Sequence, residues 1–252
     1  MGGEGLLNRV ELLKKYVSSR ITVVIPTLNE EENIAEVIKE CNFVGFSDIL
    51  VIDGNSHDST AKVAKELGAN VIYQCGKGKG DAIRKAFAHE ELGDYVVMLD
   101  ADGSMDPKEI QLFLMALQNG SDIVKGSRFM PNGYSEDMTT FRRIGNKMFI
   151  SIVNLLMGTK FTDLCYGYAA FSKEAIQKIH PHLTSPNFEI ETELFIKASQ
   201  MGFKIREVPS LEHKRKNGKS HLKAFTDGFK ILKTILLEFL RNPMYNKIVP
   251  KL

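Results

Sequence analysis

Two aspartates follow directly after a run of four apolar residues near the middle of the chain. The run is Val96–Leu99, and Asp100 and Asp102 come next with one residue between them. A short apolar run bounded by turn residues is typical of a strand in a parallel sheet that is covered on both faces. Both carboxylates at its end can reach one hard cation such as Mg²⁺ or Mn²⁺, which keeps other positions open for phosphate oxygens. A plain turn is the alternative, because Asp-Ala-Asp-Gly also favours one.

Short β-branched runs alternate with helical patterns through the first half of the chain. The predicted strands cover residues 21–25, 49–53, 70–73, 96–99 and 123–125. The predicted helices between them cover residues 31–41, 59–67, 81–91 and 107–117. This alternation predicts an α/β fold with a mostly parallel sheet flanked by helices, because parallel strands need crossover connections.

The alternation weakens after residue 139. Further strands are predicted near residues 168–171 and 204–208, and an amphipathic helix over residues 222–240. A chain of 252 residues with 43% apolar content can bury one sizeable core. We therefore expect three parts, which are a helical lead-in over residues 1–20, one α/β domain over 21–221, and a C-terminal amphipathic helix and tail over 222–252.

Charge and cysteine content narrow the class of protein. The formal net charge of +2 gives no reason to expect nucleic acid as a partner. Cys41, Cys75 and Cys165 lack metal-ligand spacing and are odd in number, which favours a reduced cytoplasmic protein over a disulfide framework. The least polar long stretch, residues 148–159, is shorter than the roughly 20 residues that span a bilayer. The sequence therefore predicts a soluble protein or one peripheral on the cytoplasmic face of a membrane.

Polar residues follow the first two predicted strands. Pro26–Glu30 comes after the first strand, and Asp53 ends the second. Ligands of open α/β sheets bind outside the carboxyl ends of the strands, so these residues should meet in one crevice. The Asp53 carboxylate can accept the imide N–H of uracil or the N1–H and N2–H of guanine. Helix capping is the alternative for half of these polar residues, including Thr27 and Glu30.

A glycine-rich segment and an arginine follow later strands. Gly76-Lys77-Gly78-Lys79-Gly80 precedes a predicted helix, where backbone N–H groups and Lys79 could cradle a phosphate. The segment lacks the Walker pattern, and a solvated turn is the alternative. Arg128 follows the strand at 123–125, so its guanidinium could clamp a diphosphate oxygen in the same crevice. An ordinary surface arginine is the alternative for Arg128.

Three motifs together resemble a known family. They are Ile-Pro-Thr-Leu-Asn-Glu-Glu at residues 25–31, Asp-Gly-x-Ser-x-Asp-Ser-Thr at residues 53–60, and Asp-Ala-Asp at residues 100–102. With these motifs the chain resembles the inverting glycosyltransferases of family 2, which have the GT-A fold, over most of its length. Within that family it is most similar to the polyprenyl- and dolichyl-phosphate sugar synthases. The domain over residues 21–221 would then be the GT-A domain.

The resemblance implies two groups of binding residues in the first half of the chain. Those implied around the nucleotide are Pro26, Thr27, Asn29, Glu30 and Asp53. Those implied around a metal ion and the diphosphate are Asp100, Ala101 and Asp102, with Lys79 at the border of the donor site.

Matching positions in the second half concern the sugar and the acceptor. By the resemblance, Glu191 lies near the sugar. An arginine at the start of the next predicted helix faces the acceptor phosphate, and of Arg142 and Arg143 we expect Arg143 to be that residue. Arg215 and Ser220 belong to a basic loop, residues 213–221, that would fold over the diphosphate. A solvated basic hairpin is the alternative for this loop.

Three positions depart from the family pattern. Ser104 stands where several relatives carry a metal-binding glutamine, which leaves Ser104 to act only through water. Ala169 stands where an arginine is expected, so one cation is missing. His221 stands where lysine is common, which changes the pH response expected of that contact.

The predicted C-terminal helix has one apolar face. Its residues are Leu222, Phe225, Phe229, Leu232, Leu236 and Phe239. Core packing is the ordinary role of such a face. If it is exposed, the face and the basic loop would form an interfacial anchor on anionic lipid, as a membrane-resident acceptor requires. A membrane partner protein could cover the face instead.

Together these residues predict metal-dependent, inverting transfer of a hexose from a UDP- or GDP-linked sugar to a polyprenyl or dolichyl phosphate. A phosphate monoester, with a second pKa near ~6, is already a nucleophile at neutral pH. Mg²⁺ or Mn²⁺ at Asp100 and Asp102 would stabilise the departing diphosphate. The expected catalytic residues are Asp102, Arg128, Glu191 and Arg215. Two alternatives stay open, namely transfer to a saccharide hydroxyl, which needs a carboxylate base, and a sugar-nucleotide-binding subunit without turnover.

Overall fold

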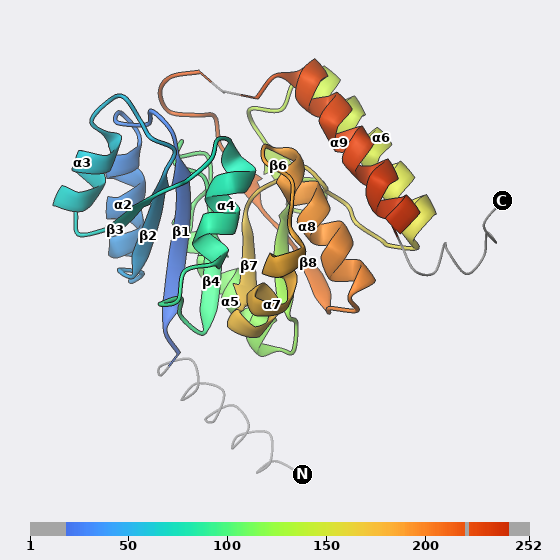
Figure 1. Ribbon diagram of the computed structural model, residues 1–252, viewed down its shortest axis with the longest axis horizontal. Coiled ribbons are helices and arrows are strands. Elements are labelled where there is room, and N and C mark those ends of the chain that lie inside the picture. Colours follow the sequence, from blue (N-terminus) through green and yellow to red (C-terminus); the bar gives the residue numbers. More distant parts are fainter. Residues whose placement is uncertain (1–18, 220–221, 242–252) are drawn as a thin grey trace, which may run out of the picture.

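Within the described residues, 19–219 and 222–241, a seven-stranded sheet forms the centre of the protein (Figure 1). The structure is a computed structural model. Residues 1–18 of the predicted lead-in, Ser220, His221 and residues 242–252 of the predicted tail lie outside these residues. The strands are β1 (Ile21–Thr27), β2 (Ile49–Asp53), β3 (Asn70–Tyr73), β4 (Tyr95–Met98), β5 (Ile123–Ser127), β7 (Ala169–Ser172) and β8 (Ile205–Pro209). Their order is β3-β2-β1-β4-β7-β5-β8, and β7 is the one of these strands that runs antiparallel to its neighbours. A small second sheet pairs β6 (Tyr134–Ser135) with β9 (Leu211–Glu212).

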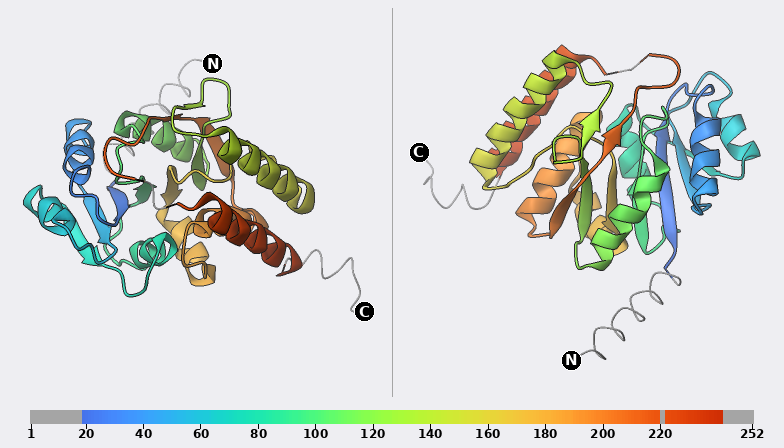
Figure 2. Two further views of the ribbon diagram at one scale, coloured as in Figure 1. Left: turned by 90° about the horizontal axis from the view of Figure 1, so that it is seen from above. Right: turned by 180° about the vertical axis from the view of Figure 1, so that it is seen from behind.

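Helices cover both faces of the large sheet, which confirms the predicted α/β fold (Figures 1 and 2). The helices on one face are α2 (Ile34–Phe43), α3 (Thr60–Glu66) and α5 (Ile110–Gln118), the last preceded by the 3₁₀ turn η1 (Pro107–Glu109). Those on the other face are α4 (Lys79–Phe87), α7 (Lys173–Ile179) and α8 (Glu189–Gln200), with the 3₁₀ turn η2 (His180–His182) between the last two. Neighbouring residues of β1 alternate between the two cores, because Val23 packs with the α2 side and Val24 with the α4 side.

Two long helices, α6 (Thr140–Met157) and α9 (Ala224–Arg241), lie side by side beyond α8 (Figures 1 and 2). The rings of Phe141 and Phe225 join them at 4.9 Å between centroids. The face of α9 that packs inward contains Ile231 and Ile235, whereas Phe225 and Phe229 are exposed. Part of the predicted apolar face therefore lies at the surface. In the described part of the chain, no helix is both long and apolar enough to cross a membrane.

The carboxyl ends of β2, β1 and β4 lie next to one another. Thr27 at the end of β1 is the register partner of Asp53 at the end of β2. The Leu99 amide, just beyond β4, donates to the Val24 carbonyl at 3.1 Å. The sheet therefore brings the segments that begin at Thr27, Asp53 and Asp100 to one edge, as predicted from the strand-end rule.

Candidate active site

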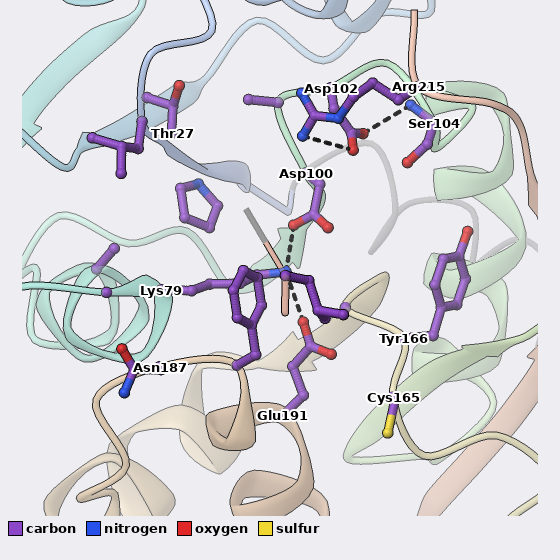
Figure 3. A pocket seen from close by; sticks show the side chains of 18 of the residues that line it. Thr27, Lys79, Asp100, Asp102, Ser104, Cys165, Tyr166, Asn187, Glu191 and Arg215 are labelled. Atoms are coloured by element: carbon purple, nitrogen blue, oxygen red, sulfur yellow. Dashed lines mark hydrogen bonds and ion pairs between the residues drawn. The ribbon is translucent and has the colours of Figure 1, made fainter. Parts of the chain in front are cut away.

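A cavity of about 340 Å³ opens at this edge of the sheet (Figure 3). The predicted residues that line it are Pro26, Thr27, Glu30, Lys79, Asp100, Ala101, Asp102, Arg128, Glu191 and Arg215. They come from the ends of strands, from the first turns of α4 and α8, and from the segment after β9. A volume of this size suits a small-molecule ligand.

The Asp100–Ser104 segment is both a turn and a carboxylate site. Gly103 adopts a positive φ of 73°, and the Ser104 amide donates to Asp102 Oδ1 at 3.0 Å. The carboxylates of Asp100 and Asp102 nevertheless both face the cavity (Figure 3). The turn interpretation and the ligand interpretation of the sequence therefore describe the same segment.

Lys79 lies between two carboxylates. Its Nζ is 2.6 Å from Asp100 Oδ1 and 2.7 Å from Glu191 Oε1 (Figure 3). Burial raises the pKa of the Asp100 carboxyl to about 6, to which Asp102 and Glu191 add while Lys79 opposes it. Burial alone lowers the pKa of Lys79, but Asp100 and Glu191 outweigh it and raise that pKa above its ordinary value. Lys79 is therefore a fixed positive charge in the wall of the cavity.

Arg215 covers the other carboxylate. Its Nη2 is 3.3 Å from Asp102 Oδ2, and its Nη1 is 2.8 Å from Glu30 Oε1. The buried Nε atom of Arg215 has no hydrogen-bond partner. Since buried donors are normally paired, this N–H is available to an oxygen that enters the cavity.

Two buried oxygen atoms at the β1 and β2 ends also lack partners. Asp53 is fully buried, and its Oδ1 accepts from the Ser56 amide at 2.8 Å, while Oδ2 accepts from no group. The hydroxyl of Thr27 is likewise buried and unpaired. An unsatisfied buried polar group costs about 1–3 kcal/mol, so the Thr27 hydroxyl, in the cavity wall, is suited to bind a ligand. Asp53 itself does not line the cavity, whereas Gly54, which directly follows it, does.

The carboxylate set fits a hard divalent cation. Among the described residues, no group of three or more His, Cys, Asp or Glu side chains is arranged to hold a metal ion. The protein would therefore supply Asp100 and Asp102, with Ser104 in the cavity wall beside them. Protein-bound Mg²⁺ usually has one or two carboxylate ligands, and phosphate oxygens of the substrate and water fill its other coordination positions.

The glycine-rich segment does not form the predicted phosphate cradle. The amides of Gly80 and Asp81 both donate to the Pro186 carbonyl, at 2.9 and 3.2 Å. A Cβ atom on Gly80 would lie 2.1 Å from the Ser185 carbonyl oxygen. Gly80 is therefore required for close packing of α4 against another backbone. Gly78 and Lys79 of the segment line the cavity.

Arg128 lies at the cavity, but protein groups already surround its guanidinium. Its Nε and Nη2 donate to Asp163 at 2.7 and 3.0 Å, and its Nη1 donates to Glu212 at 3.0 Å. Nη2 also donates to the Cys165 carbonyl, and the guanidinium stacks on the Tyr166 ring. This arrangement differs from the predicted diphosphate clamp and gives Arg128 the role of a buried structural cation.

Other predicted positions fall outside the cavity. Arg142 rather than Arg143 lines it and pairs with Asp137, whereas the Arg143 guanidinium lies over the Phe129 ring. Asn29 is exposed and shapes its loop with a positive φ of 54°, accepting the His57 amide.

Several cavity residues escaped the sequence analysis. They are Gln74, Asp137, Cys165, Tyr166, Asn187 and Phe188. Gln74 directly follows β3, so the strand-end rule that selected Asp53 would also have found it. The others sit in connections whose partners are distant in the sequence, and no local pattern marks them. Burial raises the pKa of the Cys165 thiol to about 12, which makes it a poor nucleophile.

Comparisons with known proteins agree with this geometry. A family model described as glycosyl transferase family 2 matches residues 22–180. Glycosyltransferase AglJ of Haloferax volcanii is 36% identical over 209 residues, which cover 82% of this chain and 68% of that protein. The dolichyl-phosphate hexose transferase of the same organism is 29% identical over 226 residues, covering 89% of this chain and 96% of that protein.

A solved structure shows the same fold. Glucosyl-3-phosphoglycerate synthase from Mycobacterium tuberculosis, in complex with Mn²⁺, UDP-glucose and phosphoglyceric acid, matches with a TM-score of 0.73 at 23% identity. The match covers 91% of this chain and 83% of that one. The sheet and the helices on its two faces thus define an α/β fold of the GT-A type. The chain belongs to glycosyltransferase family 2, as the resemblance predicted.

Gly167 lies against the Lys79–Glu191 ion pair. A Cβ atom at this position would be 2.6 Å from Glu191 Oε1 and 2.9 Å from Lys79 Nζ. We expect Gly167→Ala to lower kcat by roughly a hundredfold, because a displacement of ~1 Å in a site can have that effect. Initial transfer rates measure it, and Gly145→Ala is the control, since a Cβ there would contact nothing within 4 Å. Equal rates for the two variants would contradict a functional role for this pair.

Proposed function

We propose that the chain transfers a hexose from a UDP- or GDP-linked sugar to a polyprenyl or dolichyl phosphate, with inversion and with Mg²⁺ or Mn²⁺ as cofactor. The observation that carries the proposal is the pair of carboxylates, Asp100 and Asp102, in one cavity with the unpaired buried atoms of Thr27 and Arg215. The unpaired Asp53 Oδ2 lies at the neighbouring strand end, next to Gly54 in the cavity wall. The similarity to the dolichyl-phosphate hexose transferase of Haloferax volcanii supports the acceptor class.

The reaction is a single displacement. An oxygen of the acceptor phosphate attacks the anomeric carbon, the bond from that carbon to the diphosphate oxygen breaks, and its electron pair leaves with the nucleoside diphosphate. No proton has to be removed from the acceptor, because a phosphate monoester is largely dianionic above its second pKa of ~6. Inversion follows, since attack and departure take place on opposite faces of the sugar.

Each residue then has a chemical task. Asp53 Oδ2 accepts a ring N–H of the base, and Arg215 Nε donates to a diphosphate oxygen. A divalent cation held by Asp100 and Asp102 would neutralise charge that develops on the departing diphosphate. Lys79 holds Asp100 and Glu191 in place, so that both carboxylates have fixed orientations at the sugar end of the cavity.

The proposal is tested by incubating the purified chain with UDP-glucose or GDP-mannose and a short-chain polyprenyl phosphate. We expect a polyprenyl-phosphate hexose product with Mn²⁺ or Mg²⁺ present and none with EDTA, detected by mass spectrometry. Binding of nucleotide sugar without any product would instead support the non-catalytic subunit.

Transfer to a saccharide hydroxyl is a second candidate, which the position of Glu191 in the cavity favours. A hydroxyl acceptor needs a base, so Glu191→Gln would then lower the rate by several orders of magnitude. A phosphate acceptor would retain more activity in this variant. The comparison of the two acceptors in one variant separates these functions.

We further propose that the exposed apolar residues of α6 and α9 dock on a membrane surface, where the lipid acceptor resides. Phe141, Phe225 and Phe229 expose 53%, 79% and 70% of their surface. Leu222 and Ile231 line the cavity, which therefore reaches α9. Amphipathic helices with exposed aromatic and basic residues bind the interface of anionic bilayers.

The double variant Phe225→Ser/Phe229→Ser is expected to bind vesicles containing phosphatidylglycerol at least tenfold more weakly. Burial of one Phe side chain contributes about 1.5–3 kcal/mol, and about 1.4 kcal/mol corresponds to a factor of ten. Vesicle co-sedimentation measures the effect. Phe43→Ser is the matched control, because Phe43 is 86% exposed but lies on α2. If the control loses as much binding as the double variant, this surface is not the docking site.

A further inference from the structure

The segment Thr184–Phe188 forms one wall of the cavity. Asn187 and Phe188 line it, and Lys79 Nζ lies 6.0 Å from the centroid of the Phe188 ring. Figure 3 shows Asn187 at this wall, near Lys79 and Glu191. The segment leads into α8, so its position also fixes where α8 begins and where the Glu191 side chain lies.

Two side chains hold the backbone of this segment from either side. Glu193, which is 1% exposed, accepts the amides of Thr184 and Ser185 through Oε2 at 3.0 and 2.7 Å. Its Oε1 accepts the Thr184 hydroxyl at 2.8 Å. Arg84 donates through Nη1 to the carbonyls of the same two residues, at 2.5 and 3.0 Å. Hydrogen bonds to charged groups are stronger than neutral ones, so these contacts define the segment firmly.

The segment is joined directly to the first turn of α4. The Pro186 carbonyl accepts the amides of Gly80 and Asp81, which follow Lys79. Gly80 has no room for a Cβ against Ser185. A shift of the segment would therefore move the start of α4, and with it the ammonium group that holds Asp100 and Glu191.

We infer that Glu193 is a positioning residue for the sugar end of the cavity, acting through Thr184–Phe188 on Lys79 and Glu191. The inference rests on the proposed function. Glu193 does not line the cavity, and the nucleotide end, with Asp53 and Thr27, belongs to strands β1 and β2 on the far side of α4. Loss of Glu193 thus impairs sugar transfer and leaves the metal-free binding of the nucleoside diphosphate intact.

The same buried network supplies a matched control. Lys197 Nζ is 3.7 Å from Glu193 Oε1 and 2.8 Å from Glu238 Oε2 of α9. Glu238 is 2% exposed, so its carboxylate is as buried as that of Glu193. Its carboxylate accepts from Lys197 and Arg241, and its main-chain carbonyl accepts from Gln200. None of these three residues belongs to the Thr184–Phe188 segment. Glu238→Gln therefore changes the buried charges around Lys197 but leaves the hydrogen bonds to the Thr184–Phe188 segment in place.

The experiment compares Glu193→Gln, Arg84→Met and Glu238→Gln with the unmodified chain. Isothermal titration calorimetry measures the Kd of UDP and of GDP with EDTA present, so that the affinity does not depend on a cation held by Asp100. Initial rates with UDP-glucose and GDP-mannose give kcat and KM for transfer to a short-chain polyprenyl phosphate. Arg84 is partly exposed. Arg84→Met removes the hydrogen bonds on the other side of the same segment, so it can test the inference if Glu193→Gln does not fold.

For Glu193→Gln and Arg84→Met we expect kcat to fall roughly a hundredfold while the Kd of the nucleoside diphosphate stays within about twofold. Glu238→Gln is expected to keep the kcat of the unmodified chain. An equal fall of kcat in Glu238→Gln, or a matching loss of nucleotide affinity, would overturn the inference and leave the proposed function standing. Failure of the unmodified chain to bind either nucleotide and transfer sugar would overturn both.

Discussion

Replacing Asp102 with asparagine is expected to lower kcat/KM for sugar transfer by roughly three orders of magnitude. The carboxylate faces the cavity, and the protein cation nearest to it is Arg215, at 3.3 Å. Asparagine keeps the shape and can still accept the Ser104 amide through its oxygen, so the turn is preserved. What the variant loses is the negative charge that would hold a divalent cation against the diphosphate. Initial rates over a range of Mn²⁺ concentrations measure the effect.

Asp106→Asn is the control for this prediction. Asp106 lies four residues further on, caps η1 by accepting the Lys108 amide, and is not part of the cavity. We expect near-normal transfer from this variant. If Asp102→Asn retained the activity of the control, Asp102 would not belong to the catalytic machinery.

Replacing Arg128 with methionine is expected to lower the free energy of unfolding by about 3–5 kcal/mol, because it leaves buried charges without a partner. Asp163 is fully buried and Glu212 nearly so, and both depend on this guanidinium. Lysine should not rescue the fold, since an ammonium group cannot replace the paired donors of a guanidinium. Urea unfolding at neutral pH measures the loss.

The loss of unfolding free energy in Arg128→Met should depend on pH, because the charge of Asp163 does. Burial works against ionisation of Asp163, but Arg128 and Lys125 outweigh it and hold the pKa of that carboxyl below its ordinary value. The stabilisation from the ion pair is therefore present above the unfolded-state pKa and is lost as the pH falls through the folded-state value. In Arg128→Met, protonation of Asp163 removes an unpaired buried charge. The difference in free energy of unfolding between the unmodified chain and Arg128→Met should thus become smaller as the pH falls.

Arg142→Met is the control for Arg128→Met, because it also removes an arginine at the cavity but no buried ion pair. Arg142 pairs with Asp137 at 3.1 Å, and both side chains are partly exposed. Solvent-exposed ion pairs of this kind contribute about 0–1 kcal/mol to the free energy of unfolding. A loss in Arg128→Met no larger than in Arg142→Met would show that the buried network does not stabilise the fold.

The parts of this protein that the sequence could predict depend on local pattern. The alternation of strands and helices follows from hydrophobic periodicity, and Asp53, Asp100 and Asp102 follow from their places at strand ends. These features need no knowledge of which distant segments meet. The strand-end rule then brings the three aspartates to one edge of the sheet, where the structure places them.

The roles of Arg128 and of the glycine-rich segment could not be read in the same way. The carboxylate partners of Arg128 lie 35 and 84 residues further along the chain. The carbonyl that fills the predicted phosphate cradle belongs to Pro186, more than 100 residues after Gly80. Likewise, the choice between Arg142 and Arg143 depends on the rotation of α6 about its axis, which tertiary packing sets. Local sequence carries no information on these contacts.

The central claim is that Asp100 and Asp102 hold a cation which binds the diphosphate of a sugar nucleotide. Calorimetric titration of UDP and GDP into the unmodified chain and into Asp100→Asn/Asp102→Asn, each with Mn²⁺ and with EDTA, tests it most directly. We expect Mn²⁺ to tighten the binding of one nucleotide at least tenfold in the unmodified chain and to have no effect in the double variant. Equal affinity with Mn²⁺ and with EDTA in the unmodified chain would contradict the claim.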